Sequence, residues 1–313
     1  MNKILFKEHY ALVKRLPSDH LKLQTIIDDI RKMESGIRGE NRLIEKLEEL
    51  RLPGAFYILS NVQLQLGEWR VQIDCLLITD RCCIVLESKN MNDDLYFEEN
   101  SDEFYKISRD GSEITYPNPY FQLMKHIRFM KAFLENYVPE LKVTGAVVMT
   151  AKSSRIRQKP PHYPIFKLES IIEKILYMYN QSSSPQLSVH QIKHIEKMIR
   201  KKQSIYRYPP LCQYYRISPN DLILGVECPN CGELGMKRLQ RTWNCPICKK
   251  NDRNAHHMTV QEYFWLINTT ITNKEFRHFC KLDSVYSASR MLTDLNLTVH
   301  KGGAWRYYSP KKV

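Results

Sequence analysis

Several features that define other protein classes are missing from this 313-residue sequence. It contains no run of about 18 apolar residues, so we expect no membrane-spanning helix. Residues 1–20 have no apolar core between a basic flank and a cleavage site, so we expect no secretion signal and a cytoplasmic protein. The nine cysteines are too scattered for a disulfide framework. No internal repeat or low-complexity tract is present, which argues against solenoid and fibrous architectures.

The composition that is present is that of a globular protein with one basic region. Hydrophobic residues make up 43% and charged residues 26%, which suffices for a core, and the length favours two or three domains. Most of the net charge of +13 lies in residues 201–313, where 18 Lys and Arg stand against 8 Asp and Glu. This excess favours an anionic polymer as partner, nucleic acid first. The alternative is a surface charged only for solubility.

The spacing of apolar residues predicts a mixed α/β (α+β) fold, in which helices flank a mixed sheet. Ser35-Gly36 interrupts the first helical pattern, and short turns join the first three strand-like runs as hairpins. The predicted elements are helices over 20–34 and 38–51, strands over 56–66, 71–79 and 82–89, short strands within 95–116, a helix over 120–137 and a buried strand over 142–150.

Changes in composition predict five parts along the chain. A Ser-Ser-Ser-Pro run at 182–185 marks the end of the first large domain. The parts are an N-terminal helical extension over 1–35, a first large domain over 36–181, a linker and basic helix over 182–225, a four-cysteine module over 226–250 and a small helical domain over 259–313.

Four ionisable residues in the first third of the chain carry the strongest functional signal. Asp74 lies in one apolar run, and Glu87 and Lys89 end the next. Bare charges at the ends of buried strands are costly unless they are paired or bind metal. Side chains alternate along a strand, so Glu87 and Lys89 point the same way and Asp74 lies on the preceding strand of the hairpin. Glu40, expected near the start of a helix, can add a third carboxylate.

This set suits metal-dependent cleavage of phosphodiester bonds. Mg²⁺ takes one or two carboxylates and keeps several waters, and Mn²⁺ is the alternative ion. Gln122 and Lys125, three residues apart on one predicted helix, can hold substrate phosphate or the attacking water. The competing interpretation is a buried Asp74–Lys89 salt bridge, with Glu40 as a helix cap.

Four short motifs resemble those of the NERD family, the nuclease-related domain. The resemblance covers about residues 36–150 and implies the restriction-endonuclease-like fold, whose signature is Asp followed by Glu-x-Lys on adjoining strands. It implies that Asp74 and Glu87 bind metal, that Lys89 is catalytic, and that Glu40 and Gln122 complete the site. Cys75 replaces the His that is frequent in the family after the Asp, but this neighbour points to the opposite face. The motifs are Gly36-Ile37-Arg38-Gly39-Glu40, Gln72-Ile73-Asp74, Glu87-Ser88-Lys89-Asn90 and Asn118-Pro119-Tyr120-Phe121-Gln122.

Two C-x-x-C pairs, Cys228/Cys231 and Cys245/Cys248, predict a structural Zn²⁺ site. Each pair places two thiolates on one tight turn, and two such turns complete a tetrahedral site with no open position. A redox role is the weaker interpretation, since neither pair opens a helix after a strand. The module resembles the small zinc ribbons attached to topoisomerases. The residues between the two pairs, Lys237, Arg238, Arg241 and Trp243, fit contact with nucleic acid. The alternative is a ribbon that only stabilises its own domain.

The last part of the chain resembles a winged helix-turn-helix, with three helices and a terminal hairpin. A capping box at Thr272 to Glu275 starts the second helix, and the third, over 284–295, would enter the major groove of DNA. Helical trios also bind proteins, which is the alternative. The predicted nucleic-acid contacts in the whole chain are Lys125, Lys237, Arg238, Arg241, Trp243, Tyr286, Ser287, Arg290, Lys301 and Arg306.

Together these patterns predict a divalent-metal-dependent DNA endonuclease whose N-terminal domain cuts while the ribbon and winged helix bind. RNA cleavage is an alternative, as is a non-catalytic DNA-binding or regulatory protein whose nuclease fold has decayed. Pairing with a second copy of the chain is left open.

Overall fold

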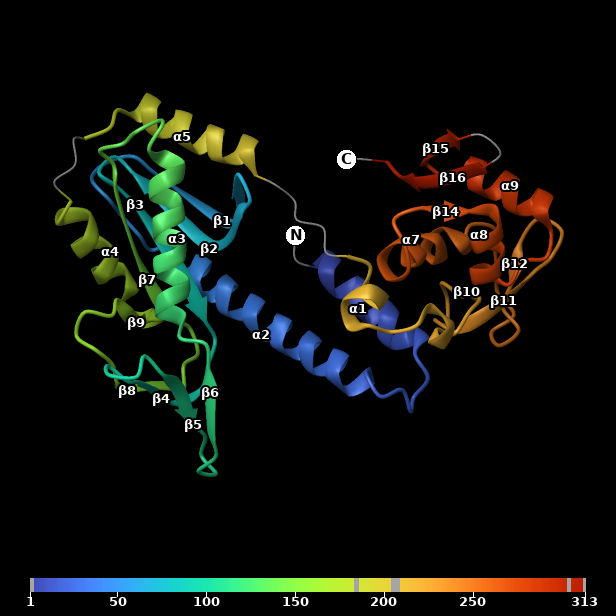
Figure 1. Cartoon of the computed structure of the whole chain (residues 1–313), viewed down its shortest axis with the longest axis horizontal. Coiled ribbons are helices and arrows are strands. Elements are labelled where there is room, and N and C mark those ends of the chain that lie inside the picture. The colour runs from blue at the N-terminus through green and yellow to red at the C-terminus, as the bar shows by residue number, and fades with distance from the viewer. Residues whose placement is uncertain (1–2, 183–185, 204–208, 303–304, 312–313) are drawn as a thin grey trace. The chain divides into compact units, whose positions relative to one another are not determined.

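The computed structural model describes residues 3–182, 186–203, 209–302 and 305–311, so Ser183–Pro185 of the predicted linker lie outside it. Figure 1 labels the helices and strands. Two compact units are present, one of residues 32–206 and one of residues 1–31 with 207–313. The mixed α/β fold is confirmed. No helix in the described ranges is long and apolar enough to cross a membrane.

The core of the 32–206 unit is a five-stranded sheet in the order β1-β2-β3-β7-β9. The first three strands form an antiparallel meander, and the predicted runs match them closely. Strand β7 follows a helix and pairs in parallel with β3, and β9 pairs in parallel with β7. The strands are β1 (Phe56–Leu66), β2 (Trp69–Thr79), β3 (Cys82–Lys89), β7 (Lys142–Met149) and β9 (Ile165–Lys167).

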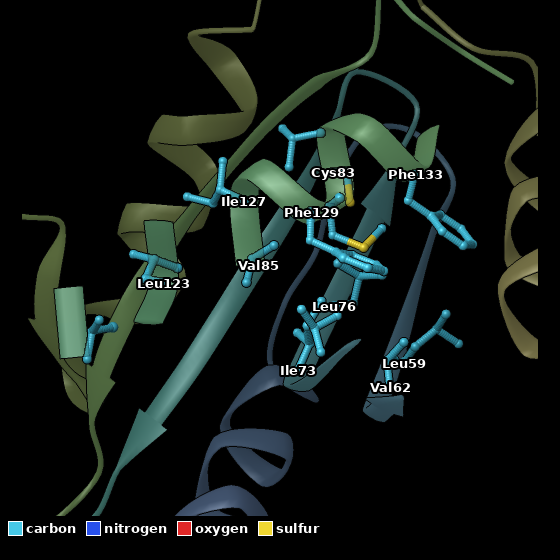
Figure 2. Packing of buried hydrophobic residues seen from close by; sticks show 14 of the residues in the cluster. Leu59, Val62, Ile73, Leu76, Cys83, Val85, Leu123, Ile127, Phe129 and Phe133 are labelled. Carbon is cyan, nitrogen blue, oxygen red and sulfur yellow. The ribbon is translucent and has the colours of Figure 1, made fainter. Parts of the chain in front are cut away.

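Helices cover both faces of this sheet. On one face lie α3 (Pro119–Leu134) and α5 (Val189–Lys202), and on the other lie α2 (Leu23–Leu47) and α4 (Ile171–Asn180), which follows a 3₁₀ turn, η1 (Leu168–Ser170). Each fully buried large apolar side chain contributes about 1.5–3 kcal/mol. Figure 2 shows the packing of α3 on β2 and β3 through Leu123, Ile127, Phe129, Phe133, Ile73, Leu76, Cys83 and Val85.

Asn118 fixes where α3 begins. Its side chain accepts a hydrogen bond from the backbone N–H of Tyr120 at 3.0 Å, and Pro119 occupies the first helical position. A capped start with proline at this position is strongly favoured. The motif that contains Asn118 therefore also sets the register of α3, and with it which side chains of α3 face β2 and β3.

A second, four-stranded sheet in the order β6-β5-β4-β8 extends the 32–206 unit. It rests on the same apolar cluster through Leu95, Phe97 and Phe104, and Phe97 stacks on Phe104 at 4.4 Å between ring centroids. Its strands are β4 (Asp93–Phe97), β5 (Phe104–Ile107), β6 (Glu113–Tyr116) and β8 (Ser154–Gln158).

The predicted break at Ser35-Gly36 is wrong, because α2 runs through it as one helix of 25 residues. A single glycine in a helix costs about 1 kcal/mol relative to alanine, and here tertiary contacts offset that cost. Asn90 donates from Nδ2 to the backbone oxygen of Ser35 at 2.8 Å, and Arg42 donates to Asn90 and to the Thr150 carbonyl. Glu40 is therefore in the middle of a helix and caps nothing.

In the other unit, the N-terminal helix α1 (Lys3–Arg15) packs among C-terminal residues. The Arg15 guanidinium is fully buried and donates to Glu262 at 2.6 and 2.8 Å, as well as to the carbonyl of Ile223. The sequence did not predict this association, since the partners lie 247 positions apart. Residues 1–31 thus belong to the C-terminal unit, while the finer five-part division stays a prediction.

The rest of this unit contains short helices, a four-stranded sheet around the cysteines and a three-stranded sheet in the order β14-β16-β15. The predicted capping box at Thr272 is present. The elements are α6 (Leu211–Tyr215), η2 (Pro219–Asp221), β10 (Val226–Glu227), β11 (Leu234–Arg238), β12 (Trp243–Asn244), β13 (Asn251–Asp252), α7 (His256–Leu266), β14 (Ile271–Thr272), α8 (Asn273–Cys280), α9 (Val285–Asp294), β15 (Leu297–Gly302) and β16 (Trp305–Pro310).

Candidate active site and metal sites

The middle of β2 and the end of β3 bring Asp74, Glu87 and Lys89 together under α3. Cys75 pairs with Leu86, so Asp74 and Glu87 follow as neighbours across the two strands. Val85 packs under α3, and strand alternation therefore puts Glu87 and Lys89 on the same face. Cys75 belongs to the cluster on the opposite face, as predicted.

A hydrogen-bonded chain links these residues to α3. Lys89 Nζ donates to Gln122 Oε1 at 2.8 Å, and Gln122 Nε2 donates to Glu87 Oε2 at 2.9 Å. The Gln122 amide thus binds the Lys89 ammonium through its oxygen and the Glu87 carboxylate through its nitrogen. Within the described residues, Lys89 does not form the alternative salt bridge with Asp74, for its ammonium contacts Gln122 instead.

His126 is a member of this group that the sequence analysis missed. Its Nδ1 contacts Oε1 of Glu87, and the ring is buried. His126 lies four residues after Gln122, one turn further along the same helix face. The four-residue spacing from Gln122 was the sequence signal that could have identified His126. It becomes informative only once Gln122 is known to face the strands.

Burial makes Glu87 an unusual acid. Its side chain has no exposed surface, and this burial raises its pKa from about 4.5 to about 7. The hydrogen bond from His126 opposes the shift, whereas the nearby charge of Asp74 adds to it. A carboxylate in this setting is costly as a bare anion, and a nearby cation lowers that cost.

Asp74 offers the more open oxygen. Its Oδ2 accepts from the backbone N–H of Ser88 at 2.8 Å and from the Ser88 hydroxyl at 3.2 Å. Oδ1 accepts no hydrogen bond from any residue that the structure describes, and the side chain is only half buried. Hard oxygen donors on two adjacent strands, one of them with a free oxygen, fit Mg²⁺ or Mn²⁺.

The three carboxylates do not close around one point. In the described parts of the chain, no group of three or more potential ligands that includes Asp74, Glu87 or Glu40 lies within 4.8 Å. Glu40 is half buried in α2, one residue after Gly39, which passes close to Asn90 and Thr150 beyond the ends of β3 and β7. The residues present thus offer two carboxylates, leaving the other positions around an ion to water.

Lys125 projects from α3 on the rim of this site. It is exposed and lines an open hollow of about 560 Å³ together with Pro117, Asn118, Phe121, Gln122 and His126. The hollow reaches the polar chain through Gln122 and His126. The hollow therefore carries a positive charge at its rim, next to the two α3 side chains that contact Glu87.

Comparison with known families agrees with this geometry. Residues 35–150 match the model of the NERD family, described as the nuclease-related domain. These residues form a nuclease-related domain. The match confirms the resemblance that the motifs indicated, and it includes every strand and helix of the polar chain. No curated protein and no solved structure matches the chain.

The four cysteines of the two C-x-x-C pairs come together as predicted. Their sulfur atoms lie within 4.8 Å of one another, and the Cys228–Cys248 and Cys231–Cys245 pairs are each 3.6 Å apart. Four thiolates bound to zinc at about 2.3 Å have sulfurs about 3.8 Å apart if tetrahedral. The cluster thus has the size of a zinc site and can hold such an ion.

One predicted nucleic-acid contact beyond the NERD domain is wrong. The Trp243 ring is fully buried and donates from Nε1 to Nδ1 of His256 at 3.2 Å, so it has no face on which a base can stack. Packing in the core of the ribbon, and not contact with a ligand, therefore explains why a Trp lies between the two cysteine pairs. Arg238 is half buried against this ring.

The other predicted contacts in this unit lie at the surface. Tyr286 is 89% exposed at the start of α9, and Lys301 faces Arg306 across the β15–β16 hairpin. Ser287 is half buried, whereas the remaining side chains are exposed, namely Lys237, Arg241, Arg290, Lys301 and Arg306.

Proposed function

We propose that this protein is a divalent-metal-dependent nuclease whose NERD domain hydrolyses phosphodiester bonds of DNA. The observation that supports it most is the chain from Lys89 through Gln122 to Glu87, with Asp74 on the adjoining strand. A buried acid, an open carboxylate oxygen and a positioned ammonium meet there beside an exposed hollow. A purely structural ion pair would not need the intervening amide.

Each residue then has a distinct role. Asp74 and Glu87 would hold Mg²⁺ or Mn²⁺, which when bound would supply a water of lowered pKa and offset negative charge on the phosphate. Gln122 fixes both Lys89 and Glu87, and His126 holds the other oxygen of Glu87. Lys89 stabilises negative charge as the phosphodiester reacts. Glu40 completes the site from α2, and Lys125 receives the backbone of the substrate.

The C-terminal unit supplies DNA binding in this proposal. The order α7-β14-α8-α9-β15-β16, with β16 central in its sheet, corresponds to a winged helix-turn-helix. On this basis α9 enters the major groove with Tyr286, Ser287 and Arg290, while Lys301 and Arg306 meet phosphates. The cysteines hold one structural Zn²⁺ that orders the adjoining ribbon.

A cleavage assay tests the proposal. Purified protein is incubated with supercoiled, linear and single-stranded DNA and with RNA, each with Mg²⁺, Mn²⁺ or EDTA. We expect metal-dependent cleavage that falls at least about 100-fold in Asp74→Ala and in Lys89→Ala. DNA affinity should change little, because binding resides in the other unit.

Glu113→Ala is the matched control, since Glu113 is an exposed acid on β6 of the same unit. Its activity should equal that of the unchanged protein. Full activity in Asp74→Ala would contradict the assignment of the site. Cleavage of RNA alone would favour the RNA-nuclease alternative, and binding without cleavage of any substrate would favour the non-catalytic one.

A further inference from the structure

Three buried N–H groups near the cysteine cluster have no acceptor among the described residues. They are Nε and Nη1 of Arg238 on β11 and Nε2 of His256 at the start of α7. The side chain of Arg238 forms no hydrogen bond and no salt bridge with any residue in the described ranges. Leaving a buried donor unsatisfied costs about 1–3 kcal/mol, and more when the group is charged.

The hydrogen bond to Trp243 shows that His256 Nε2 is a donor. An indole N–H can only donate, so Nδ1 of His256 must accept it, at 3.2 Å. A neutral imidazole whose Nδ1 accepts carries its proton on Nε2. His256 is 4% exposed, and its pKa is lowered to about 4, first by burial and then by His257 and Arg238, against the opposing effects of Asp252 and the Arg253 backbone. The ring is therefore neutral at pH 7 and presents an N–H.

Trp243 brings these donors to one place. The Arg238 guanidinium lies over the indole ring, 5.3 Å from its centroid, while His256 binds the indole nitrogen. Arg290 of α9 is close enough to lower the pKa of Arg238, an effect second to that of burial. Arg238 and His256 thus contact the same indole, the charge of Arg290 acts on Arg238, and in the part of the chain that the structure describes no carboxylate is bound to Arg238 or His256.

A group that offers only acceptors satisfies such a set, and the positive charges of Arg238 and Arg290 favour an anion in that place. Arginine matches the oxygens of phosphate through parallel N–H groups. We propose that Arg238, His256 and Arg290 form a binding site for one phosphate group. The neutral imidazole adds a hydrogen bond without further like charge.

The observations favour a phosphate of a nucleic-acid backbone as the occupant, a step that rests on the proposed function. The same unit exposes large aromatic rings beside its basic residues, with Tyr286 89% and Trp305 76% exposed. Exposed aromatics next to a phosphate site are typical of nucleic-acid surfaces. The site lies between the cysteine ribbon and α9, so one phosphate there would fix how the backbone passes both.

Titration of the full-length protein with inorganic phosphate tests the site directly. Binding is followed by the NMR signal of the Trp243 indole N–H, assigned with Trp243→Phe, and by thermal stability relative to sodium chloride of equal ionic strength. We expect saturable shifts that weaken at least about tenfold in Arg238→Gln and several-fold in Arg290→Gln. Lys274→Gln, which removes an exposed charge from α8, should bind like the unchanged protein.

Arg290 is exposed, so its variant reports on the site even if Arg238→Gln fails to fold. The phosphate site would be overturned if phosphate binding weakened equally in Arg238→Gln, Arg290→Gln and Lys274→Gln, or if the shifts never saturated. In a parallel arm, Arg238→Gln should weaken binding of a short DNA oligonucleotide. Phosphate binding with unchanged oligonucleotide affinity would overturn the nucleic-acid occupant alone, and Asp74→Ala should retain phosphate binding whatever its cleavage activity.

Discussion

At the scale of single residues, Glu87 links the stability of the NERD domain to pH. Its folded pKa of about 7 lies above the ordinary value of about 4.5, so the folded state favours the protonated acid. The stabilisation from that proton is complete below pH 4.5 and is lost as pH rises to 7. The largest possible loss is about 3 kcal/mol, at 1.36 kcal/mol for each pKa unit.

Glu87→Gln should therefore remove this pH dependence. In EDTA, the variant should become more stable relative to the unchanged protein between pH 5 and pH 8, by up to about 3 kcal/mol. Urea unfolding at the two pH values measures the difference. Mg²⁺ at pH 8 should restore stability to the unchanged protein only, because the variant lacks the carboxylate that binds the ion. A constant difference across this pH range would contradict the raised pKa.

Some site residues could be predicted from sequence and others could not. Asp74, Glu87 and Lys89 stand out because alternation along two short strands assigns their faces without further information. His126 faces the site only through the helix register that Asn118 sets. Trp243 looked like a nucleic-acid contact because its neighbours are basic, but burial depends on α7, which follows it in the chain.

At the scale of elements, two glycines in α2 have opposite roles. A Cβ at Gly36 meets nothing within 4 Å, whereas one at Gly39 lies 2.7 Å from Thr150 Oγ1 and 2.9 Å from Asn90 Cβ. Gly36→Ala should stabilise the protein by about 0.4–1 kcal/mol, and Gly39→Ala should destabilise it by about 1–3 kcal/mol. Denaturant midpoints of both variants decide this, and the opposite order would show that α2 does not pass Thr150 closely.

Gly36 also explains why the helix was predicted as two. A Ser-Gly pair reads locally as a break, and nothing in the sequence shows that Asn90 and Thr150 hold the helix across it. The three strands of the meander were predicted almost to the residue, because apolar runs and tight turns are local signals. Helix α1, β8 and β9 were not predicted, since their contacts are with distant segments.

Zinc removal tests the cysteine ribbon as an element. A chelator, or Cys245→Ser, should remove about one zinc per chain and unfold residues near 226–252, because structural zinc and folding are coupled in small modules. Hydrogen exchange should show this loss while β2 and β3 stay protected. A fully protected ribbon in metal-free protein would mean that its sheet and Trp243 suffice without the ion.

At the scale of the whole molecule, the fold joins distant parts of the chain in a way the sequence does not reveal. Arg15 and Glu262 form a buried ion pair between the two ends of one unit. Loss of one partner from such a pair typically costs about 3–5 kcal/mol. The DNA binding that we propose for the C-terminal unit is therefore best measured in the full chain, where α1 is present.

The proposal that DNA binds to that unit makes a prediction about salt. Arg290, Lys301 and Arg306 are exposed there, and Lys193, Lys197 and Lys201 are exposed on α5 of the NERD unit. Replacing either trio by alanine removes three positive charges. Only the first trio should contact phosphates, so only its loss should weaken duplex binding strongly and reduce the slope of log affinity against log salt by about 2–3. Fluorescence anisotropy from about 50 to 200 mM salt measures both slopes. Equal slopes for the two triple variants would mean that duplex affinity depends only on the overall charge of the protein. A larger effect of the α5 trio would mean that the duplex binds to the 32–206 unit instead.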